Sequence, residues 1–479
     1  MAQLRFRLQD RSRLPDEWLH RLYVAGSEEI PWPTRCSWQG DLLHVERSVV
    51  ESGCVSAPWP VEGRPRTVLT TATLMVRERP YQLEVELARG LIQRVRNRLF
   101  LWEFVGLQTP QDVVQRLHEA TKVFARAATH QHDPAEAARL AEEAIRQGLD
   151  AGEDLVAHFA RQAIDARRKH GPISTLLGVA LPPEPPDVSV RRRLLDACNI
   201  VQIPMGWRAI EKREGKRDWT ATDDVLGWCQ TAGIKAIAGP LLRMEENGVP
   251  DWMYLWEGDF DNLAGLIVDH VESVVKRYAG RVHLWHVASK VNGGTLLSLD
   301  EEQRLQLVAL ALEAVRRQDP RTPTVVSFNQ PWGDYLAQRD DELAPLHYAD
   351  ALVRAELGVS GFGLEIDVRN QPSGTLHRPS FEFGALVDQW SMMGMPLMVS
   401  LECGGDGPDG ATLDLNAAEK AQRKWAEAML PLLLARTPVQ VVLWNQLKDG
   451  TQRASGLLDD TGNAKPTLKL MQDLRKSCL

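Results

Sequence analysis

Residues 274–290, VVKRYAGRVHLWHVASK, contain the unit that is repeated through the C-terminal part of the chain. They include the end of a helical pattern, LIVDHVESVVKRYAG, which is followed directly by the buried strand RVHLWHV. The strand runs out into a polar loop that begins with Ser289 and Lys290. A helix followed by a buried strand is the unit from which α/β folds with parallel sheets are built.

Seven further apolar runs of the same kind occur after Gly171. With the first run, the set covers residues 174–181, 199–205, 235–242, 281–287, 323–330, 361–368, 396–403 and 439–446. Most are separated by a helical stretch such as QRLQLVALALEAVRRQ. Eight strands alternating with helices over about 300 residues predict a (β/α)₈ TIM barrel. An open doubly wound sheet is the alternative, but its first strand would commonly end in a glycine-rich phosphate turn, and GVALPPEPPD is not one.

The α/β chain is predicted to have three parts. Residues 1–86 contain the pieces LRFRL, DLLHVERSVV, RTVLTTATLMV and YQLEVEL, which predict a small β-sandwich-like accessory module. Residues 87–170 predict a helical connector, in which Asp133 caps a helix that starts at Pro134. Residues 171–479 contain the barrel. The first module is either a structural lid or a sugar-binding module, and the lack of a site signature in it favours the structural role.

Composition limits the partners and the location. The net charge of −8 gives the chain no overall basic field, so neither nucleic acid nor a membrane surface is expected as a partner. Fifteen tryptophans stand against six tyrosines, and an indole face either stacks on a sugar ring or fills a core. We find neither a spanning apolar stretch of about 18 residues nor an export signal, so a cytoplasmic location is the default expectation, with export by another route left open.

Neither a metal nor a cofactor is expected. His130 and His132 lie in the helical connector, and no histidine pair occurs at a strand end. Neither a G-x-S-x-G elbow nor a Walker loop occurs. The six cysteines are scattered without a CxxC pair, which predicts reduced thiols, with a bridge between Cys36 and Cys54 as the alternative.

The candidate site residues are those at the strand ends, because the active site of a (β/α)₈ barrel lies at the carboxyl ends of its strands. They are Trp207, Arg208, Pro240, Ser289, Lys290, Asn329, Gln330, Glu365, Asp367, Glu402, Trp444 and Asn445. The carboxylates stand inside the apolar runs GFGLEIDV and MVSLEC, where a charge is costly unless it faces a polar cleft or is paired. Glu402 is therefore either a functional group or the salt-bridge partner of a barrel cation.

From about Ile173 onward the chain resembles the family 10 glycoside hydrolases, the xylanase family. The stretches that carry the resemblance are LLGVAL, VVKRYAGRVHLWHVASK, MPLMVSLE and GLLDDTGNAKP. The resemblance implies a (β/α)₈ barrel that binds a β-1,4-linked glycan. It places Glu402 at the position of the catalytic nucleophile, Lys290 at that of the acid/base glutamate, Ser289 at that of the preceding asparagine, and Trp444 at that of the strand-eight tryptophan over the substrate.

The chain departs from the family pattern where the acid is needed. Retaining hydrolysis requires two carboxyl groups about 5 to 5.5 Å apart. A lysine, with its usual pKa of about 10.4, holds its proton too tightly to act well as an acid. In addition, Pro240 stands where the family has a strand-three histidine, the stretch IPMGW lacks the Glu-Asn-x-Met-Lys element, and Glu365 and Asp367 stand where the family has Gln and His.

Two functions are compatible with these residues. In the first, the chain is a carbohydrate-active protein with a β-glycan cleft, in which Glu402 is the nucleophile and Glu365 or Asp367 supplies the second carboxyl from the neighbouring strand. In the second, Lys290 pairs with Glu402, and a non-catalytic relative binds a saccharide or a protein in the same cleft. The expected ligand contacts are Trp207, Ser289, Lys290, Asn329, Gln330, Trp444 and Asn445. No pattern indicates the oligomeric state.

Overall fold

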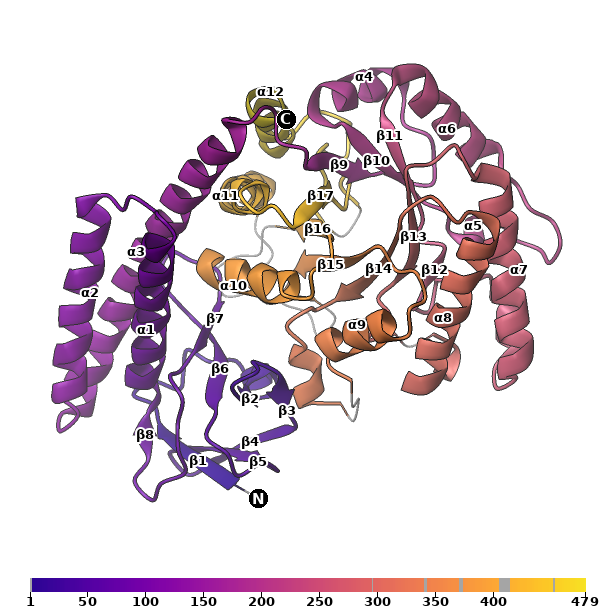
Figure 1. The fold of residues 1–479 in the computed structure, drawn as a ribbon. Helices are drawn as coiled ribbons and strands as arrows, with labels where there is room; N and C mark the ends of the chain where they lie inside the picture. Colours follow the sequence, from indigo (N-terminus) through magenta and orange to yellow (C-terminus); the bar gives the residue numbers. More distant parts are fainter. Residues whose placement is uncertain (1, 295, 340–342, 370–373, 405–413, 451–452) are drawn as a thin grey trace.

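A closed barrel of parallel strands forms the C-terminal part of the chain (Figure 1). The computed structural model describes residues 2–294, 296–339, 343–369, 374–404, 414–450 and 453–479. Within these residues, the eight strands of the barrel are β9 (Leu176–Ala180), β10 (Ile200–Ile203), β11 (Lys235–Ala238), β13 (Leu284–Ser289), β14 (Thr324–Asn329), β15 (Gly361–Val368), β16 (Leu397–Cys403) and β17 (Val439–Trp444). Pairing of β17 with β9 and of β11 with β13 closes the ring. The predicted barrel is confirmed, and each apolar run overlaps one strand.

Helices surround the barrel. They are α4 (Val188–Ala197), α5 (Trp207–Ile210), α6 (Thr220–Ala232), α7 (Phe260–Tyr278), α8 (Glu301–Gln318), α9 (Pro345–Arg354), α10 (Ser380–Ser391), α11 (Leu415–Leu434) and α12 (Pro466–Cys478), with 3₁₀ turns at η2 (Asp251–Trp256), η3 (Leu296–Ser298) and η4 (Asp334–Ala337). The short strand β12 (Leu242–Arg243) follows β11 and pairs with β13. In the described ranges, no helix combines the length and the apolar character that crossing a membrane requires.

The strands of the barrel divide their side chains between two cores. Met398 of β16 belongs to a cluster of strand residues, whereas Val399 and Leu401 belong to the core shared with the helices. Successive side chains of a strand point to opposite faces. Met398, Ser400 and Glu402 therefore share the inner face of β16, and Glu402 lies at its carboxyl end.

Two small sheets form the N-terminal part. One contains β4 (Thr34–Gln39), β5 (Leu42–Arg47), β1 (Ala2–Arg7) and β8 (Tyr81–Gln82), and the other β3 (Pro31–Trp32), β2 (Tyr23–Ala25), β6 (Cys54–Trp59) and β7 (Thr67–Thr70), with the 3₁₀ turn η1 (Asp16–Arg21) between β1 and β2. Phe6 and Val45 from the first sheet and Val55 and Ala57 from the second belong to one buried cluster. The sheets are those expected of a β-sandwich-like module, and the division of the chain into separate domains stays a prediction.

Three long helices lie along one side of the molecule, next to the N-terminal sheets and the barrel (Figure 1). They are α1 (Leu83–Phe104), α2 (Gln111–Thr129) and α3 (Pro134–Arg168). The predicted start of α3 is confirmed, because the Asp133 side chain accepts a hydrogen bond from the Glu136 amide at 3.2 Å and Pro134 is the first helical residue. One side of α3 packs on α1 and α2 and another on α10 and α11, so α3 joins the N-terminal part to the barrel.

Two expectations about the N-terminal part are corrected. The piece YQLEVEL is mostly helical, because only Tyr81–Gln82 forms a strand and α1 already begins at Leu83. Residues 83–88 are all buried, so no polar face marks the helical period, and the alternation of apolar residues with glutamate imitates a strand. Cys36 on β4 and Cys54 on β6 are free thiols and do not form the alternative bridge.

We predict that Gly90→Ala destabilises the protein by about 1–3 kcal/mol, because overpacking forces the backbone to shift. A Cβ at Gly90 in α1 would lie 2.0 Å from the carbonyl oxygen of Thr70, at the end of β7. The matched control is Gly227→Ala in α6, where a Cβ meets nothing within 4 Å. The control should stabilise the helix by about 0.5–1 kcal/mol. Urea unfolding of both variants measures the difference, and equal effects would contradict the close approach of α1 to β7.

Candidate functional site

A polar cleft of about 300 Å³ lies at the carboxyl ends of the barrel strands. Its lining comes from strands β10, β12 and β13–β16 and from the segments after β11, β13, β14, β15 and β17. The lining residues are Gln202, Pro240, Arg243, His286, Ser289, Lys290, Asn329, Gln330, Glu365, Ile366, Asp367, Arg369, Thr375, Ser400, Glu402, Asn445, Gln446 and Arg453. We call this the strand-end cleft.

Glu402 and Asp367 face each other at one side of the strand-end cleft. They are direct partners in the register of β15 and β16. The same guanidinium nitrogen, Nη1 of Arg453, donates to Oε1 of Glu402 at 2.8 Å and to Oδ1 of Asp367. Asn445 Nδ2 donates to the other oxygen of Glu402 at 2.8 Å, and Ser455 Oγ donates to Oε1 at 3.0 Å. Glu402 is thus both in the cleft and paired with a cation.

Asp367 has a perturbed protonation equilibrium. Its burial raises the pKa above the ordinary value, and the adjacent Glu402 carboxylate raises it further. The positive charges of Arg453 and Arg369 act in the opposite direction, and Arg369 Nη2 lies 2.9 Å from Asp367 Oδ2. The net pKa remains raised, so Asp367 binds a proton more readily than an exposed aspartate does.

Lys290 belongs to a different ion cluster on another side of the strand-end cleft. Its Nζ lies 2.5 Å from Oε2 of Glu245, in the loop after β12, and Arg243 Nη1 lies 2.9 Å from Oε1 of the same residue. Burial raises the pKa of Glu245, but the charges of Lys290 and Arg243 outweigh this effect and lower it. The second of the two alternatives paired Lys290 with Glu402, and the structure differs from it, because Lys290 pairs with Glu245 and Glu402 with Arg453.

A line of hydrogen bonds crosses the barrel beneath the cleft. Gln202 Nε2 donates to His286 Nδ1 at 3.0 Å, and His286 Nε2 lies 2.7 Å from Ser327 Oγ. Ser327 in turn donates to Glu365 Oε1, so its hydroxyl accepts from His286. Burial, with a smaller contribution from the charge of Arg243, lowers the pKa of His286 to about 3, which keeps the ring neutral. These hydrogen bonds connect Glu365 with side chains of three other strands, β10, β13 and β14.

Four polar atoms in the lining have no hydrogen-bond partner among the described residues. They are Ser289 Oγ, Asn329 Oδ1, Arg369 Nε and Thr375 Oγ1. A buried polar atom without a partner costs about 1–3 kcal/mol, so such atoms are normally satisfied by protein, water or ligand. Their position around one cleft means that a ligand rich in hydroxyl groups can satisfy both the acceptors and the donors.

Most of the expected site residues line the strand-end cleft. The structure brings together Ser289, Lys290, Asn329, Gln330, Glu365, Asp367, Glu402 and Asn445. Trp207 and Trp444 differ from the expectation, because both are buried in the core. Trp207 stacks on His270 with ring centroids 4.5 Å apart, and the Trp444 indole donates to the Ser455 carbonyl at 2.8 Å. Neither indole offers a face to a ligand.

Several lining residues, among them Arg453, Arg369, Gln202 and His286, were not predicted from the sequence. Arg453 lies in a loop beyond β17, and neither a strand end nor a motif marks it. Arg369 follows the end of β15 by one residue, which is a signal that the sequence offered. Gln202 and His286 also offered one, because they are polar residues inside apolar strands. In the part of the chain that the structure describes, no group of three or more His, Cys, Asp or Glu side chains is arranged to hold a metal ion.

Comparison with known proteins agrees with this architecture. The family model described as Glycosyl hydrolase family 10 matches residues 194–295, a range that includes β13 and Lys290. Endo-1,4-beta-xylanase 3 from two strains of Hypocrea jecorina is 31% identical over 120 residues. This alignment covers 24% of the chain and 34% of the relative, so the chain spans about a third of the length of the curated relatives it matches.

The barrel is also similar to solved structures. Native xylanase 10B from Thermotoga maritima has a TM-score of 0.50 at 13% identity, and covers 66% of this chain and 98% of its own. GH10 from Paenibacillus barcinonensis has a TM-score of 0.50 at 18% identity, and covers 66% of this chain and 97% of its own. These likenesses show the fold. The resemblance to family 10 glycoside hydrolases is confirmed for the barrel and for the matched residues.

We predict that Arg453→Gln raises the pKa of Asp367 further, by about one unit or more, because a cation in direct contact lowers a carboxyl pKa by roughly 1–3 units. The measurement is an NMR titration of ¹³Cγ-labelled aspartate, with Asp367→Asn to assign the signal. Arg243→Gln is the matched control, because Arg243 lines the same cleft but pairs with Glu245. An Asp367 pKa that changes equally in both variants would contradict the direct contact of Arg453 with Asp367.

Proposed function

We propose that the strand-end cleft binds a short β-glycan and that the chain is a non-catalytic relative of the family 10 glycoside hydrolases. The position of Arg453 is the observation that carries this proposal. Its Nη1 contacts both Asp367 and Glu402, so a guanidinium occupies the space between the two carboxyl groups. In retaining hydrolysis the glycosidic bond lies between the two carboxyls. The Arg453 guanidinium between them therefore leaves no room for that bond.

The lining of the cleft supports a saccharide as the ligand. The unpartnered atoms of Ser289, Asn329 and Thr375 suit hydroxyl groups, which both donate and accept. The charged residues are largely balanced within two ion clusters, which favours a neutral polar ligand over an ion. A volume of about 300 Å³ is at the small end of the usual range for ligand pockets, about 300–1,000 Å³. One or two sugar units fit that size better than a long chain.

The residue at the position expected for the acid/base group, Lys290, also supports the absence of retaining hydrolysis. Lys290 stands where the resemblance places the acid/base glutamate, and it holds an ion pair with Glu245. This contact with Glu245 occupies the ammonium group, and a lysine side chain does not replace a carboxyl group as the acid/base of retaining hydrolysis. Glu365 offers no simple replacement, because its register partner on β16 is Ser400, two residues before Glu402. Two residues along a strand correspond to about 6.6 Å.

Hydrolysis is the second candidate, and the raised pKa of Asp367 favours it. A general acid works best when its pKa lies near the operating pH, and burial together with the Glu402 charge moves Asp367 in that direction. In this alternative Glu402 attacks the anomeric carbon and Asp367 protonates the leaving oxygen. Arg453 would have to move away from both carboxylates when substrate binds.

We predict that xylotriose binds the wild-type protein in isothermal titration calorimetry and that Asn329→Ala weakens binding about fivefold to tenfold. The loss corresponds to one hydrogen bond, about 1 kcal/mol. Asn97→Ala on α1 is the matched control and should leave the affinity unchanged. Absence of binding at millimolar xylotriose, or equal loss in both variants, would contradict a saccharide site in the strand-end cleft.

We also predict that wild-type protein does not release 4-nitrophenol from 4-nitrophenyl β-xylobioside faster than Glu402→Gln does. Lys290→Glu should remain equally inactive, because Arg453 still fills the space between Asp367 and Glu402. The measurement is absorbance over a long incubation at several pH values. Turnover by the wild type that Glu402→Gln abolishes would establish the second candidate and overturn the first.

A further inference from the structure

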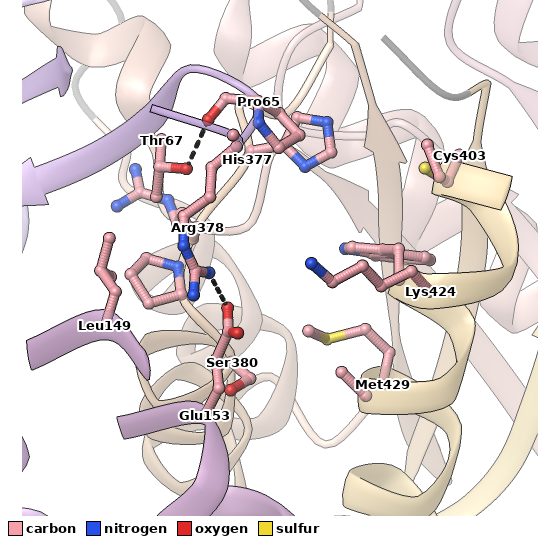
Figure 2. Close-up of a pocket in the computed structure, with 16 residues that line it drawn as sticks. Pro65, Thr67, Leu149, Glu153, His377, Arg378, Ser380, Cys403, Lys424 and Met429 are labelled. Carbon is pink, nitrogen blue, oxygen red and sulfur yellow. Dashed lines mark hydrogen bonds and ion pairs between the residues drawn. The ribbon is translucent and has the colours of Figure 1, made fainter. Parts of the chain in front are cut away.

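A second cavity of about 300 Å³ lies where the N-terminal part meets the barrel (Figure 2). Its walls come from the loop between β6 and β7, from α3, from the loop before α10, and from α11. We call it the interface pocket. It shares no lining residue with the strand-end cleft.

The end of β16 separates the two cavities. Glu402 lines the strand-end cleft, while the next residue, Cys403, lines the interface pocket. Successive side chains of a strand point to opposite faces, so the two cavities lie on opposite sides of the same strand. The segment before α10 also contributes to both cavities, with Thr375 in the cleft and His377 in the pocket. The interface pocket is therefore a separate site and not an extension of the cleft.

Most of the surface of the interface pocket is apolar. Leu149 of α3 faces Met429 of α11 across the space (Figure 2). Trp425 and Pro379 also belong to the lining and add apolar rings to it. Trp425 is held in place by an edge-to-face contact with Trp444, with ring centroids 6.2 Å apart. An aromatic wall of fixed orientation suits a ligand that contains a flat ring.

Besides Nε of Arg378, two polar atoms of uncharged side chains in the wall lack a hydrogen-bond partner among the described residues. They are His377 Nε2 and Ser380 Oγ, both buried and both in the lining. Burial lowers the pKa of His377 to about 4, so its ring is neutral near pH 7 and offers a hydrogen bond without a charge. An apolar molecule would leave both atoms unsatisfied, whereas a ligand with a polar head satisfies them.

Lys424 supplies a positive charge that is not balanced within the wall. Its side chain extends from α11 into the space toward the loop of His377 and Arg378 (Figure 2). Among the described residues its ammonium makes no ion pair or hydrogen bond. The two arginines of the wall are compensated, Arg64 by Asp150 and Glu153 and Arg378 by Asp334. Three carboxylates thus stand against the three cations, and Lys424 is the cation of the wall that makes no ion pair among the described residues, so its ammonium can contact an anionic group of a ligand.

We propose that the interface pocket is a binding site for a small aromatic monocarboxylate. The ring lies between Leu149, Trp425 and Met429, and the carboxylate pairs with Lys424. The carboxylate oxygens also accept hydrogen bonds from the neighbouring polar side chains of the 377–380 loop. This site is independent of the function proposed for the strand-end cleft.

The test uses 2-naphthoate and its neutral analogue 2-naphthalenemethanol with the full-length protein in isothermal titration calorimetry. We expect one molecule of 2-naphthoate to bind and the alcohol to bind at least tenfold more weakly, since a charge-assisted hydrogen bond is lost. Lys424→Gln should weaken 2-naphthoate at least tenfold while leaving the alcohol unchanged. Lys420→Gln, one turn earlier on α11 and outside the lining, is the matched control and should change the affinity less than twofold.

A second variant tests the location of the bound ring. Ala428→Trp fills the apolar end of the interface pocket and should abolish binding of both probes, while xylotriose binding, where present, stays unchanged. Lys424 is exposed, so Lys424→Gln keeps the test interpretable if Ala428→Trp fails to fold. The proposal is overturned if 2-naphthoate fails to bind at 1 mM, if the alcohol binds as tightly, or if Lys424→Gln and Lys420→Gln have the same effect.

Discussion

The pairing of β15 with β16 places Asp367 directly beside Glu402, and the structure around the strand ends depends on how this like-charge contact is resolved. Two carboxylates in a partly buried position repel each other and lose hydration, so a cation or a shared proton must compensate. Arg453 provides the cation through one nitrogen, and the raised pKa of Asp367 shows that the compensation is incomplete. Any ligand of the cleft has to fit around the Arg453 guanidinium and the two carboxyl groups that it contacts.

Lys290 belongs to a second ion cluster, on another side of the cleft. Its ammonium pairs with Glu245, which also pairs with Arg243. The charged side chains of these two clusters pair with one another, and the unpartnered polar atoms of Ser289, Asn329 and Thr375 also line the cleft. An ordered arrangement of dipoles and unpartnered donors and acceptors is well suited to hold hydroxyl groups.

The helix α3 connects the barrel helices near the strand-end cleft with the N-terminal part of the chain. It packs on α1 and α2 on one side and on α10 and α11 on another, so the barrel helices that flank β16 are in contact with the N-terminal part. The interface pocket lies in this contact. Because the side chains of β16 alternate, one strand end contributes Glu402 to the cleft and Cys403 to the pocket.

The sequence by itself determined the barrel, because eight apolar runs alternating with helical patterns leave few other ways to bury so many apolar strands. It also determined which strand ends carry carboxylates, and hence the positions of Glu365, Asp367 and Glu402. It misled at YQLEVEL, where complete burial hides the helical period, and at Trp207 and Trp444, where a tryptophan that stacks on a sugar and one in the core look alike.

Only the tertiary structure decided the ion partners. Arg453 comes from a loop 51 residues after Glu402, and Glu245 from a loop 45 residues before Lys290. Contacts over such distances arise because paired strands bring the loops that follow them together, which no local pattern encodes.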